Sequence, residues 1–580
     1  MKFNKYYQDE LAYLRDLGRE FAAENPALAP YLSSESNDPE VERLLEGFAF
    51  LTGRLRQKLD DEFPEFSHSL IQLTLPQFLK PVPAATIMEF APIASAVSGN
   101  DVIPKGTIVE SGPVDGTNCP FQTTTDVSLR CANIIDVRVE NMRRSGRLSL
   151  HMKIEPASLE QANWPSLRLY LAGTKGTNLS RALYKALLSE TKAITLSDAT
   201  DKKITLNKEH LMPAGLTAGE SMIPTSYGGF AGYTLLQEYF SFPNKFLFVD
   251  LKLPKNLNLT GTILTIEFLL DSPFELANTV SKDSIRINCT PAINLFPHQG
   301  DPILADERTT EYRLTARSKN GNQLNIFSVE QVTGWRQGEG RGVKYPRFES
   351  FRSLNTGGDK TYYSIRRRPP VVGSNTEHYL AFTKDDGNEI NLRVETISTD
   401  LICTNGKMAS QIPIGDINRA TGNSPSFATF KNIREVSPEI PPPLHKDLLW
   451  PLILTASQHL GSLLSADALK TLIAANYQRA FYDHQDKRRL DLIYEGLLDI
   501  EGVNLDWMIN GAPRRGTEIV MKVEESKFGG SGELYLFGNV LNRFLDLYAN
   551  INSVHRLRII GTEQQLELLW PIRGGERQSL

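Results

Sequence analysis

Residues 38–63, DPEVERLLEGFAFLTGRLRQKLDDEF, have the pattern of one long amphipathic helix. Asp38 is suited to cap the helix N-terminus, and Pro39 fits the first helical position, where its missing N–H loses no hydrogen bond. Apolar side chains then recur every three or four residues, which is the spacing of one helix face. These side chains are Val41, Leu44, Leu45, Phe48, Leu51, Leu55 and Leu59. The stretch therefore predicts a helix of about seven turns.

A second amphipathic stretch precedes this helix at residues 6–21, YYQDELAYLRDLGREF. Its apolar residues at helical spacing are Tyr7, Leu11, Leu14, Leu17 and Phe21. Two such stripes need apolar cover, supplied either by the chain's own core or by helices of another subunit. The pattern alone favours the chain's own core, and both arrangements stay open at this point.

The middle of the chain has the pattern of short β-strands. From residue 84, runs of alternating apolar and polar residues are bounded by Gly, Pro, Asn and Asp. In RLSLHMKIEP, residues 147–156, every second side chain is apolar, as in a half-buried antiparallel strand. Helical spacing returns after residue 445, and one such register contains Leu534, Phe537, Leu541, Phe544 and Tyr548.

We therefore expect an α+β multidomain protein in four parts. These are a helical unit at 1–83, β-rich domains at 84–290, a second β-rich domain with Pro-rich connectors at 291–444, and a C-terminal α+β domain at 445–580. The Pro-rich segments at 76–83 and 438–443 are stiff, so they are candidate hinges between these parts.

Composition and charge narrow the class of protein. Hydrophobic residues make up 41% and charged residues 23% of the chain, as in a soluble globular protein. A net charge of -5 gives no basic footprint for nucleic acid. The longest apolar run, residues 448–456, is about half as long as a transmembrane helix, and no hydrophobic signal region follows Met1. We expect a cytoplasmic protein with no nucleic-acid partner and no segment inserted in a membrane.

The sequence lacks the local motifs of common catalytic and cofactor sites. It contains no phosphate-binding GxxxxGK[ST] loop and no HExxH pair, and GGSGE at 529–533 departs from the GxSxG pattern of a serine nucleophile. The four cysteines are too far apart for a CxxC metal or redox site. We therefore expect no enzymatic activity, no cofactor and no metal.

The densest basic cluster is Arg366–Arg368, with Tyr362 and Tyr363 beside it. Basic and aromatic residues together could contact a nucleic-acid backbone. Arginines in one strand alternate between its two sides, however, so ion pairing with an acidic partner at an interface rim is the favoured interpretation.

Several long stretches, in the same order along the chain, resemble one known family. They are YYQDELAYLRDLGREFAAENPALAPYL (6–32), DPEVERLLEGFAFLTGRLRQKLDDEFPEF (38–66), LTLPQFLKPVPAATIMEF (73–90), NCTPAINLFPH (288–298) with GDPI (300–303) and EYRL (311–314), and GELYLFGNVLNRFLDLYANINSVHRL (532–557). Together they are similar to the TssF family, also called ImpG or VasA, whose members are baseplate subunits of the bacterial type VI secretion system. DVIPKGTIVES (101–111) and FQTTTDVSL (121–129) also resemble an element of phage baseplate wedge proteins. Residues 310–430 carry the least of this resemblance.

The resemblance implies a structural protein with a phage-wedge-like fold rather than an enzyme. It implies assembly with TssG, TssK, TssE and a second TssF copy around a VgrG spike, in the cytoplasm beneath the inner membrane. The base of the sheath and tube is a further candidate contact. The implied role is to initiate tail assembly and to transmit contraction.

The resemblance also changes the prediction for the two apolar stripes. In related wedges, amino-terminal helices of two copies and a TssG-like partner form a bundle, and the spacing 41, 44, 48, 51, 55 suits knobs-into-holes packing. We therefore expect partner contacts at Tyr7, Leu11, Leu14, Val41, Leu44, Phe48, Leu51 and Leu55. A second candidate interface consists of Phe537, Leu541 and Phe544, with a domain core as the open alternative.

Two other functions remain to be weighed. A wedge protein of a phage or phage-like contractile tail would share the same motifs, and neighbouring genes for a capsid would identify it. A β-rich carbohydrate-active enzyme is a remote alternative, which would need a cleft with two close carboxylates.

Overall fold

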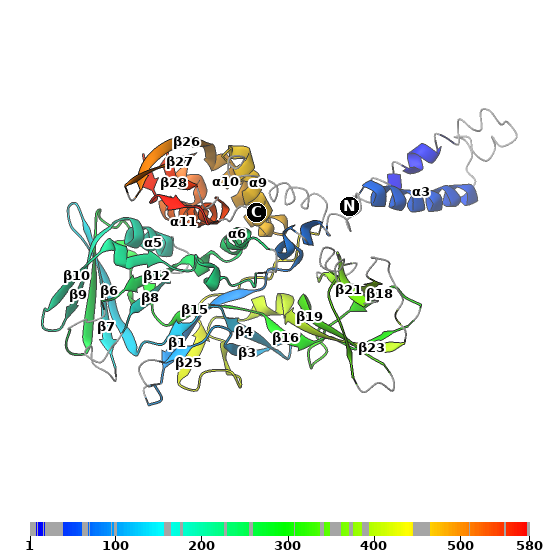
Figure 1. The fold of residues 1–580 in the computed structure, drawn as a ribbon, viewed down its shortest axis with the longest axis horizontal. Helices are drawn as coiled ribbons and strands as arrows, with labels where there is room; N and C mark the ends of the chain where they lie inside the picture. The colour runs from blue at the N-terminus through cyan, green and yellow to red at the C-terminus, as the bar shows by residue number, and fades with distance from the viewer. Residues whose placement is uncertain are drawn as a thin grey trace.

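A computed structural model gives the fold of most of the chain (Figure 1). It describes residues 7, 8, 10–15, 17, 39–60, 68, 70–72, 74–93, 95–97, 101–155, 164–173, 178–225, 229–254, 259–306, 308–336, 341–348, 361–370, 375–384, 392, 394–444, 464–509, 511–549 and 553–576. The helical pattern expected at 448–463 and the apolar residue Phe21 lie outside the described residues.

A central antiparallel sheet takes its strands from three separate parts of the chain. Across the sheet these are β24 (Ile417–Ala420), β3 (Ile108–Val114), β4 (Thr117–Thr123), β15 (Cys289–Ile293), β1 (Ala85–Pro92) and β25 (Ala428–Asn432). All five residues of β15 are buried, because this strand lies between β4 and β1. Position 290, expected as a boundary between β-rich domains, therefore lies inside a strand shared by both.

The two β-rich regions are insertions between strands of the central sheet. Residues 132–286 form a five-stranded sheet, in the order β10-β9-β13-β7-β6, and a four-stranded sheet, in the order β11-β12-β8-β14. Their bounds are β6 (Ala132–Asn141), β7 (Gly146–Ile154), β8 (Ser166–Leu171), β9 (Thr191–Asp198), β10 (Lys203–Asn207), β11 (Leu211–Pro213), β12 (Phe248–Lys252), β13 (Ile263–Leu270) and β14 (Ile285–Arg286). Alternation in β7 is confirmed, since Leu148, Leu150, Met152 and Ile154 are all buried.

The second insertion, residues 296–404, contains two further sheets around their own core. One has the order β16-β23-β19-β20 with β17 also paired to β23, and the other has the order β18-β22-β21. Their bounds are β16 (Phe296–Gln299), β17 (Ile303–Ala305), β18 (Glu311–Leu314), β19 (Asn325–Trp335), β20 (Val343–Tyr345), β21 (Thr361–Arg368), β22 (Glu377–Lys384) and β23 (Glu395–Thr404).

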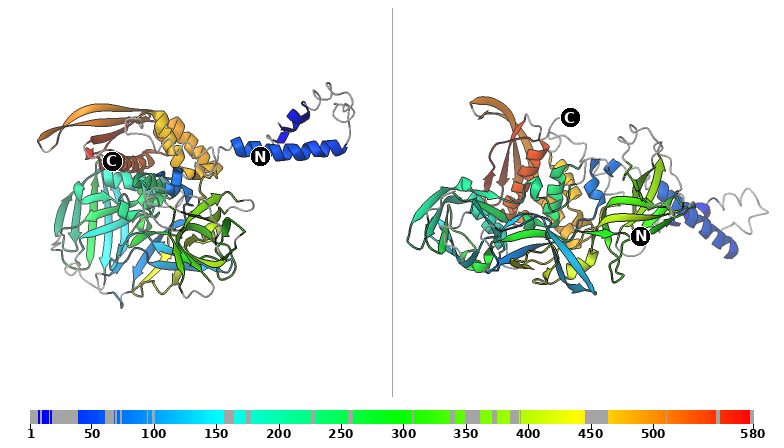
Figure 2. Two further views of the ribbon diagram at one scale, coloured as in Figure 1. Left: turned by 45° about the vertical axis from the view of Figure 1, so that its right-hand side comes forward. Right: turned by 60° about the horizontal axis from the view of Figure 1, so that its bottom comes forward.

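The C-terminal part is an α+β unit. Its helices are α9 (Ala466–Asn476), α10 (His484–Gly496) and α11 (Ser531–Tyr548). Its strands are β26 (Leu497–Ile509), β27 (Ala512–Val523), β28 (Val554–Gly561), β29 (Glu567–Leu569) and β30 (Arg573–Gly574). Because β27 and β28 pair in parallel, α11 is the crossover that connects them. The long hairpin of β26 and β27 extends beyond the body in Figure 2.

The C-terminal unit shares one core with the first insertion. Helix α11 packs against α5 (Leu179–Ser189) and α6 (Ala231–Ser241), and buried residues of all three helices belong to a single hydrophobic cluster. A continuous core of this kind makes the two units one rigid body rather than two independently mobile domains.

The two candidate hinges pair with each other. The backbone N–H of Val82 donates to the carbonyl of Ile440 at 2.8 Å, and the N–H of Ile440 donates back to the carbonyl of Val82 at 2.9 Å. A short 3₁₀ helix, Pro76–Leu79, lies next to this bridge with all four residues buried. Paired, buried backbone is the opposite of what a hinge needs, so the hinge interpretation of these segments is wrong for this conformation.

Candidate partner interface

Helix α3 (Pro39–Asp60) projects away from the body in Figure 1 and in both views of Figure 2. On one of its faces Leu44 is 74% exposed, Phe48 is 55% exposed and Leu51 is 67% exposed. These three residues are spaced four and three apart, so they form one continuous stripe. Large apolar side chains with such exposure, gathered on one helix face, are typical of a surface that another protein covers.

The neighbouring face of α3 is covered by the chain itself. Ala49 is fully buried and Leu45 is half-buried. The helical residues between 7 and 17 lie beside α3 in the views, and among them Tyr7, Leu11 and Leu14 are half-buried. We infer that the two amino-terminal helices cover one face of each other and leave the stripe Leu44–Phe48–Leu51 uncovered.

The structure thus divides the first set of predicted interface residues. Leu44, Phe48 and Leu51 are exposed, whereas Tyr7, Leu11 and Leu14 are already partly covered within the chain. Val41 and Leu55 lie in α3, but their side chains are outside the description. Tyr13, Leu17 and Phe50 are exposed apolar residues outside the predicted interface set. Tyr13 and Phe50 fall beside the two regular stripes, whereas Leu17 belongs to the first stripe.

The second predicted interface is a core. Phe537, Leu541 and Phe544 are buried on α11, in the cluster that α11 shares with α5 and α6. The ring of Phe544 lies 6.1 Å from that of Phe230 and 5.9 Å from that of Tyr233, centroid to centroid. The interface interpretation is therefore wrong for these three side chains, and the alternative of a domain core describes them.

The basic cluster of β21 is paired mostly within the chain. Arg366 and Arg368 both bind the carboxylate of Glu311 on β18, which lies beyond β22 in the same sheet. Arg367 points to the other side, where its Nη1 donates to Gln72 Oε1 at 3.2 Å. The prediction that these arginines pair with an acidic partner at an interface rim is therefore wrong for Arg366 and Arg368, since both already form ion pairs with Glu311 of the same chain.

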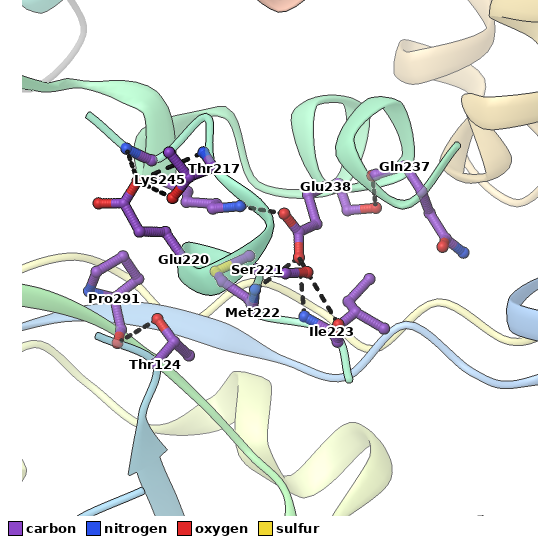
Figure 3. A network of polar contacts seen from close by, with 12 residues as sticks. Thr124, Thr217, Glu220, Ser221, Met222, Ile223, Gln237, Glu238, Lys245 and Pro291 are labelled. Carbon is purple, nitrogen blue, oxygen red and sulfur yellow. Dashed lines mark hydrogen bonds and ion pairs between the residues drawn. The ribbon is translucent and has the colours of Figure 1, made fainter. Parts of the chain in front are cut away.

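The most deeply buried ion pair joins α6 to the segment that follows it (Figure 3). Glu238 and Lys245 are both 1% exposed, and Lys245 Nζ donates to Glu238 Oε2. The other carboxylate oxygen accepts hydrogen bonds from Ser221 Oγ at 2.8 Å, Met222 N at 2.6 Å and Ile223 N at 2.8 Å. Both oxygens thus bond groups of the protein, so this buried carboxylate fixes a loop onto α6.

Among the residues that the structure describes, no group of three or more His, Cys, Asp and Glu side chains is arranged to hold a metal ion. No helix in the same residues combines the length and the hydropathy needed to cross a membrane.

Comparison with known proteins gives consistent matches over nearly the whole length. A family model described as "Type VI secretion system, TssF" matches residues 1–577. The type VI secretion system component TssF1 of Pseudomonas aeruginosa is 28% identical over 630 residues, and the match covers 99% of each chain.

Two solved structures are similar to this fold. A chain in the TssK-TssF-TssG baseplate subcomplex of a type VI secretion system, determined by cryo-electron microscopy, has a TM-score of 0.74 and 27% identity, covering 92% of this chain and 99% of that chain. A chain in the baseplate complex of a type VI secretion system has a TM-score of 0.61 and 26% identity, covering 100% of both chains. Since the family model matches almost every residue, the chain belongs to the TssF family of the type VI secretion system.

Proposed function

We propose that this protein is a structural wedge subunit of a type VI secretion baseplate and that it binds its neighbours through the uncovered face of α3. The observation that carries the proposal is the stripe Leu44–Phe48–Leu51, which is exposed on a helix whose adjacent face is already covered. Burial of one such side chain stabilises an interface by about 1.5–3 kcal/mol. Three of them at heptad-like spacing on one helix face suit packing against a helix of a partner.

The partners follow from the complexes in which similar chains are found. One similar chain comes from a TssK-TssF-TssG baseplate subcomplex, so TssG-like and TssK-like proteins are the first candidates. TssE, a second copy of this chain, a VgrG spike and the base of the sheath and tube are further proposed neighbours. The proposed location is the cytoplasm beneath the inner membrane, reached through other subunits, and the proposed role involves no catalysis.

A wedge subunit must transmit force when the sheath contracts, and the fold suits this task. The core shared by the C-terminal unit and the first insertion makes most of the body one rigid piece. The bridge between Val82 and Ile440 fixes the start of the central sheet to its end. Movement between waiting and fired states is therefore expected at contacts with other subunits, which rearrange as rigid bodies.

The test of the proposal is a triple substitution, Leu44→Asp, Phe48→Asp and Leu51→Asp. We expect it to abolish copurification of the chain with a TssG-like partner expressed in the same cells, because three carboxylates would have to be buried in an apolar bundle. The melting temperature of the isolated chain should stay within about 2 °C of the wild type, since the three side chains are exposed in it.

A matched control is Leu304→Asp. Leu304 is 68% exposed, like Leu51, but it lies on β17 in the second insertion. This variant should copurify normally. Wild-type recovery of the partner by the triple variant would refute the assignment of the interface to α3.

A further inference from the structure

A pocket of about 290 Å³ opens where three distant parts of the chain meet. Its walls include Lys105 from the segment before β3, Ser128 and Arg130 from the segment after β4, and Asn288 and Cys289 at the start of β15. The remaining walls come from Ser166 and Arg168 on β8, Asp250 on β12 and Glu220 in the loop drawn in Figure 3. The pocket lies at the junction of the central sheet and the first insertion, and none of its residues belongs to the interface proposed on α3.

Arg130 is the buried cation of this pocket. Its side chain is 6% exposed, and its Nη2 donates to the carbonyl of Ser166 at 3.0 Å. The guanidinium also stacks over the Trp164 ring at 5.6 Å. Asn288 fixes the backbone of Arg130 from both sides, since its Oδ1 accepts from Arg130 N and its Nδ2 donates to Arg130 O, each at 2.8 Å. The guanidinium is thus held in one place.

Asn288 adopts a strained backbone to make these contacts. Its φ is +54°, in the left-handed region that non-glycine residues rarely adopt. The adjacent turn at Pro104–Thr107 also requires a left-handed residue, which is Gly106 with φ +85°, and this turn carries Lys105 into the pocket wall. Strain of this kind is stored where a local geometry must be held in place.

The other two cations of the pocket, Arg168 and Lys105, already bond groups of the chain. Arg168 binds Asp250 through two hydrogen bonds of 2.7 Å and Glu220 through a third of 2.7 Å. The ammonium of Lys105 donates to the carbonyl of Gly219 at 2.9 Å. Among the described residues, no carboxylate lies within ion-pair distance of Arg130, and burial alone lowers the pKa of its guanidinium. A guanidinium has five N–H donors, and one is committed to Ser166.

We propose that this pocket binds a carboxylate presented by an acidic peptide segment of an assembly partner, with Arg130 as the residue that receives it. A guanidinium and a carboxylate match in planar geometry and form two parallel N–H···O bonds. Asp250, Glu220 and Asp126 already place negative charge in the pocket walls, so a single negative charge fits better than the higher charge of a phosphate. The peptide source rests on the proposed function, because a wedge subunit is surrounded by protein.

The stability of an Arg130 variant separates this role from a structural one. If Arg130 only supported the fold, its replacement would destabilise the chain. A buried cation without a counter-ion instead costs stability, and an apolar residue of similar length removes that cost. We therefore expect Arg130→Met to melt at or above the wild-type temperature.

The experiment measures binding of a fluorescein-labelled peptide with alternating Ser and Glu residues to the purified full-length chain by fluorescence anisotropy. We expect saturable binding that a Ser-Gln peptide of the same length does not show, and displacement by acetate at lower concentration than by inorganic phosphate at matched ionic strength. Arg130→Met should weaken binding about tenfold or more, which is the loss of one charge-assisted bidentate contact. Arg138→Met, at an exposed arginine on β6, is the matched control and should bind normally.

Equal binding of the Glu and Gln peptides, or unchanged affinity of Arg130→Met, would overturn the proposal. Stronger displacement by phosphate than by acetate would overturn the assignment to a carboxylate. If Arg130→Met melts lower than the wild type, the deciding variant is Arg130→Lys, which keeps a cation but lacks the planar guanidinium. A several-fold loss of peptide affinity in Arg130→Lys supports the proposal. Unchanged peptide affinity in this variant rejects it. The α3 triple variant should bind the peptide normally, so failure at the pocket and failure at the wedge interface are distinguished.

Discussion

Glu238→Gln should lower the free energy of unfolding of the shared core by about 3–5 kcal/mol, which is the usual cost of removing one partner from a buried ion pair. The substitution keeps the size of the side chain but leaves Lys245 buried without a counter-charge. It also replaces one acceptor by an amide NH₂, which faces either the ammonium of Lys245 or the N–H groups of Met222 and Ile223. The measurement is denaturant unfolding followed by fluorescence of Trp164 and Trp570, which both belong to that core.

Two variants make this prediction specific to the buried pair. Lys192 and Asp271 form an exposed ion pair at 2.6 Å, and Lys192→Met should change stability by less than about 1 kcal/mol. The double substitution Glu238→Leu with Lys245→Met removes both charges and should cost less than Glu238→Gln alone, because no unpaired charge stays buried. A cost for Glu238→Gln equal to that of Lys192→Met would show that water reaches this pair and solvates it.

The elements that sequence periodicity predicts well are those whose apolar residues recur at a regular spacing. The helix at 39–60, the strand at 146–154 and the helix at 531–548 each have such a spacing, and all three are present. Helix α6 escaped prediction because every residue from Gly232 to Ser241 is buried, so the helix has no polar face to reveal its period. The apolar spacing of residues 488–500 is helical, yet the chain is a strand from Leu497, since pairing with β27 overrides local preference there.

Local sequence patterns do not predict which strands from distant parts of the chain pair with each other. The expected order of two successive β-rich domains differs from the structure because β15 pairs with β1 and β4, and β25 pairs with β1 across more than 300 residues of sequence. Such non-local pairing leaves no periodic signal. The same limit explains the pocket at Arg130, whose walls come from segments that only the fold brings together.

For the interface, periodicity identified apolar faces but not what covers them. The stripe on α3 and the stripe on α11 have the same helical spacing, yet Leu44 is exposed and Phe544 is fully buried. The two stripes differ because α5 and α6 pack against α11, and this packing belongs to the tertiary structure, which local spacing does not reveal. The structure leaves partner contact on the first stripe a prediction, and it excludes partner contact by the buried residues of the second.

Phe544→Ala tests this distinction and should cost about 3–5 kcal/mol in the unfolding of the shared core, because a large buried ring is replaced by a cavity. Phe544 stacks on Tyr548 with a centroid distance of 5.4 Å and contacts Phe230 and Tyr233 at the end of α6. The packing around the ring is tight, since a Cβ at Gly232 would clash with the Phe230 ring and lie 3.0 Å from the Phe544 ring. The effect should appear in the isolated chain, with no partner present.

The matched control is Phe48→Ala, which makes the same change at an exposed position of the α3 stripe. It should alter the stability of the isolated chain by less than about 0.5 kcal/mol and weaken recovery of a TssG-like partner. Phe544→Ala should show the reverse, with normal recovery of the partner under conditions where the variant is folded. Unchanged stability of Phe544→Ala together with loss of a partner would mean that α11 presents this ring to another subunit. A loss of stability in Phe544→Ala with normal recovery of the partner assigns this ring of α11 to the core of the body.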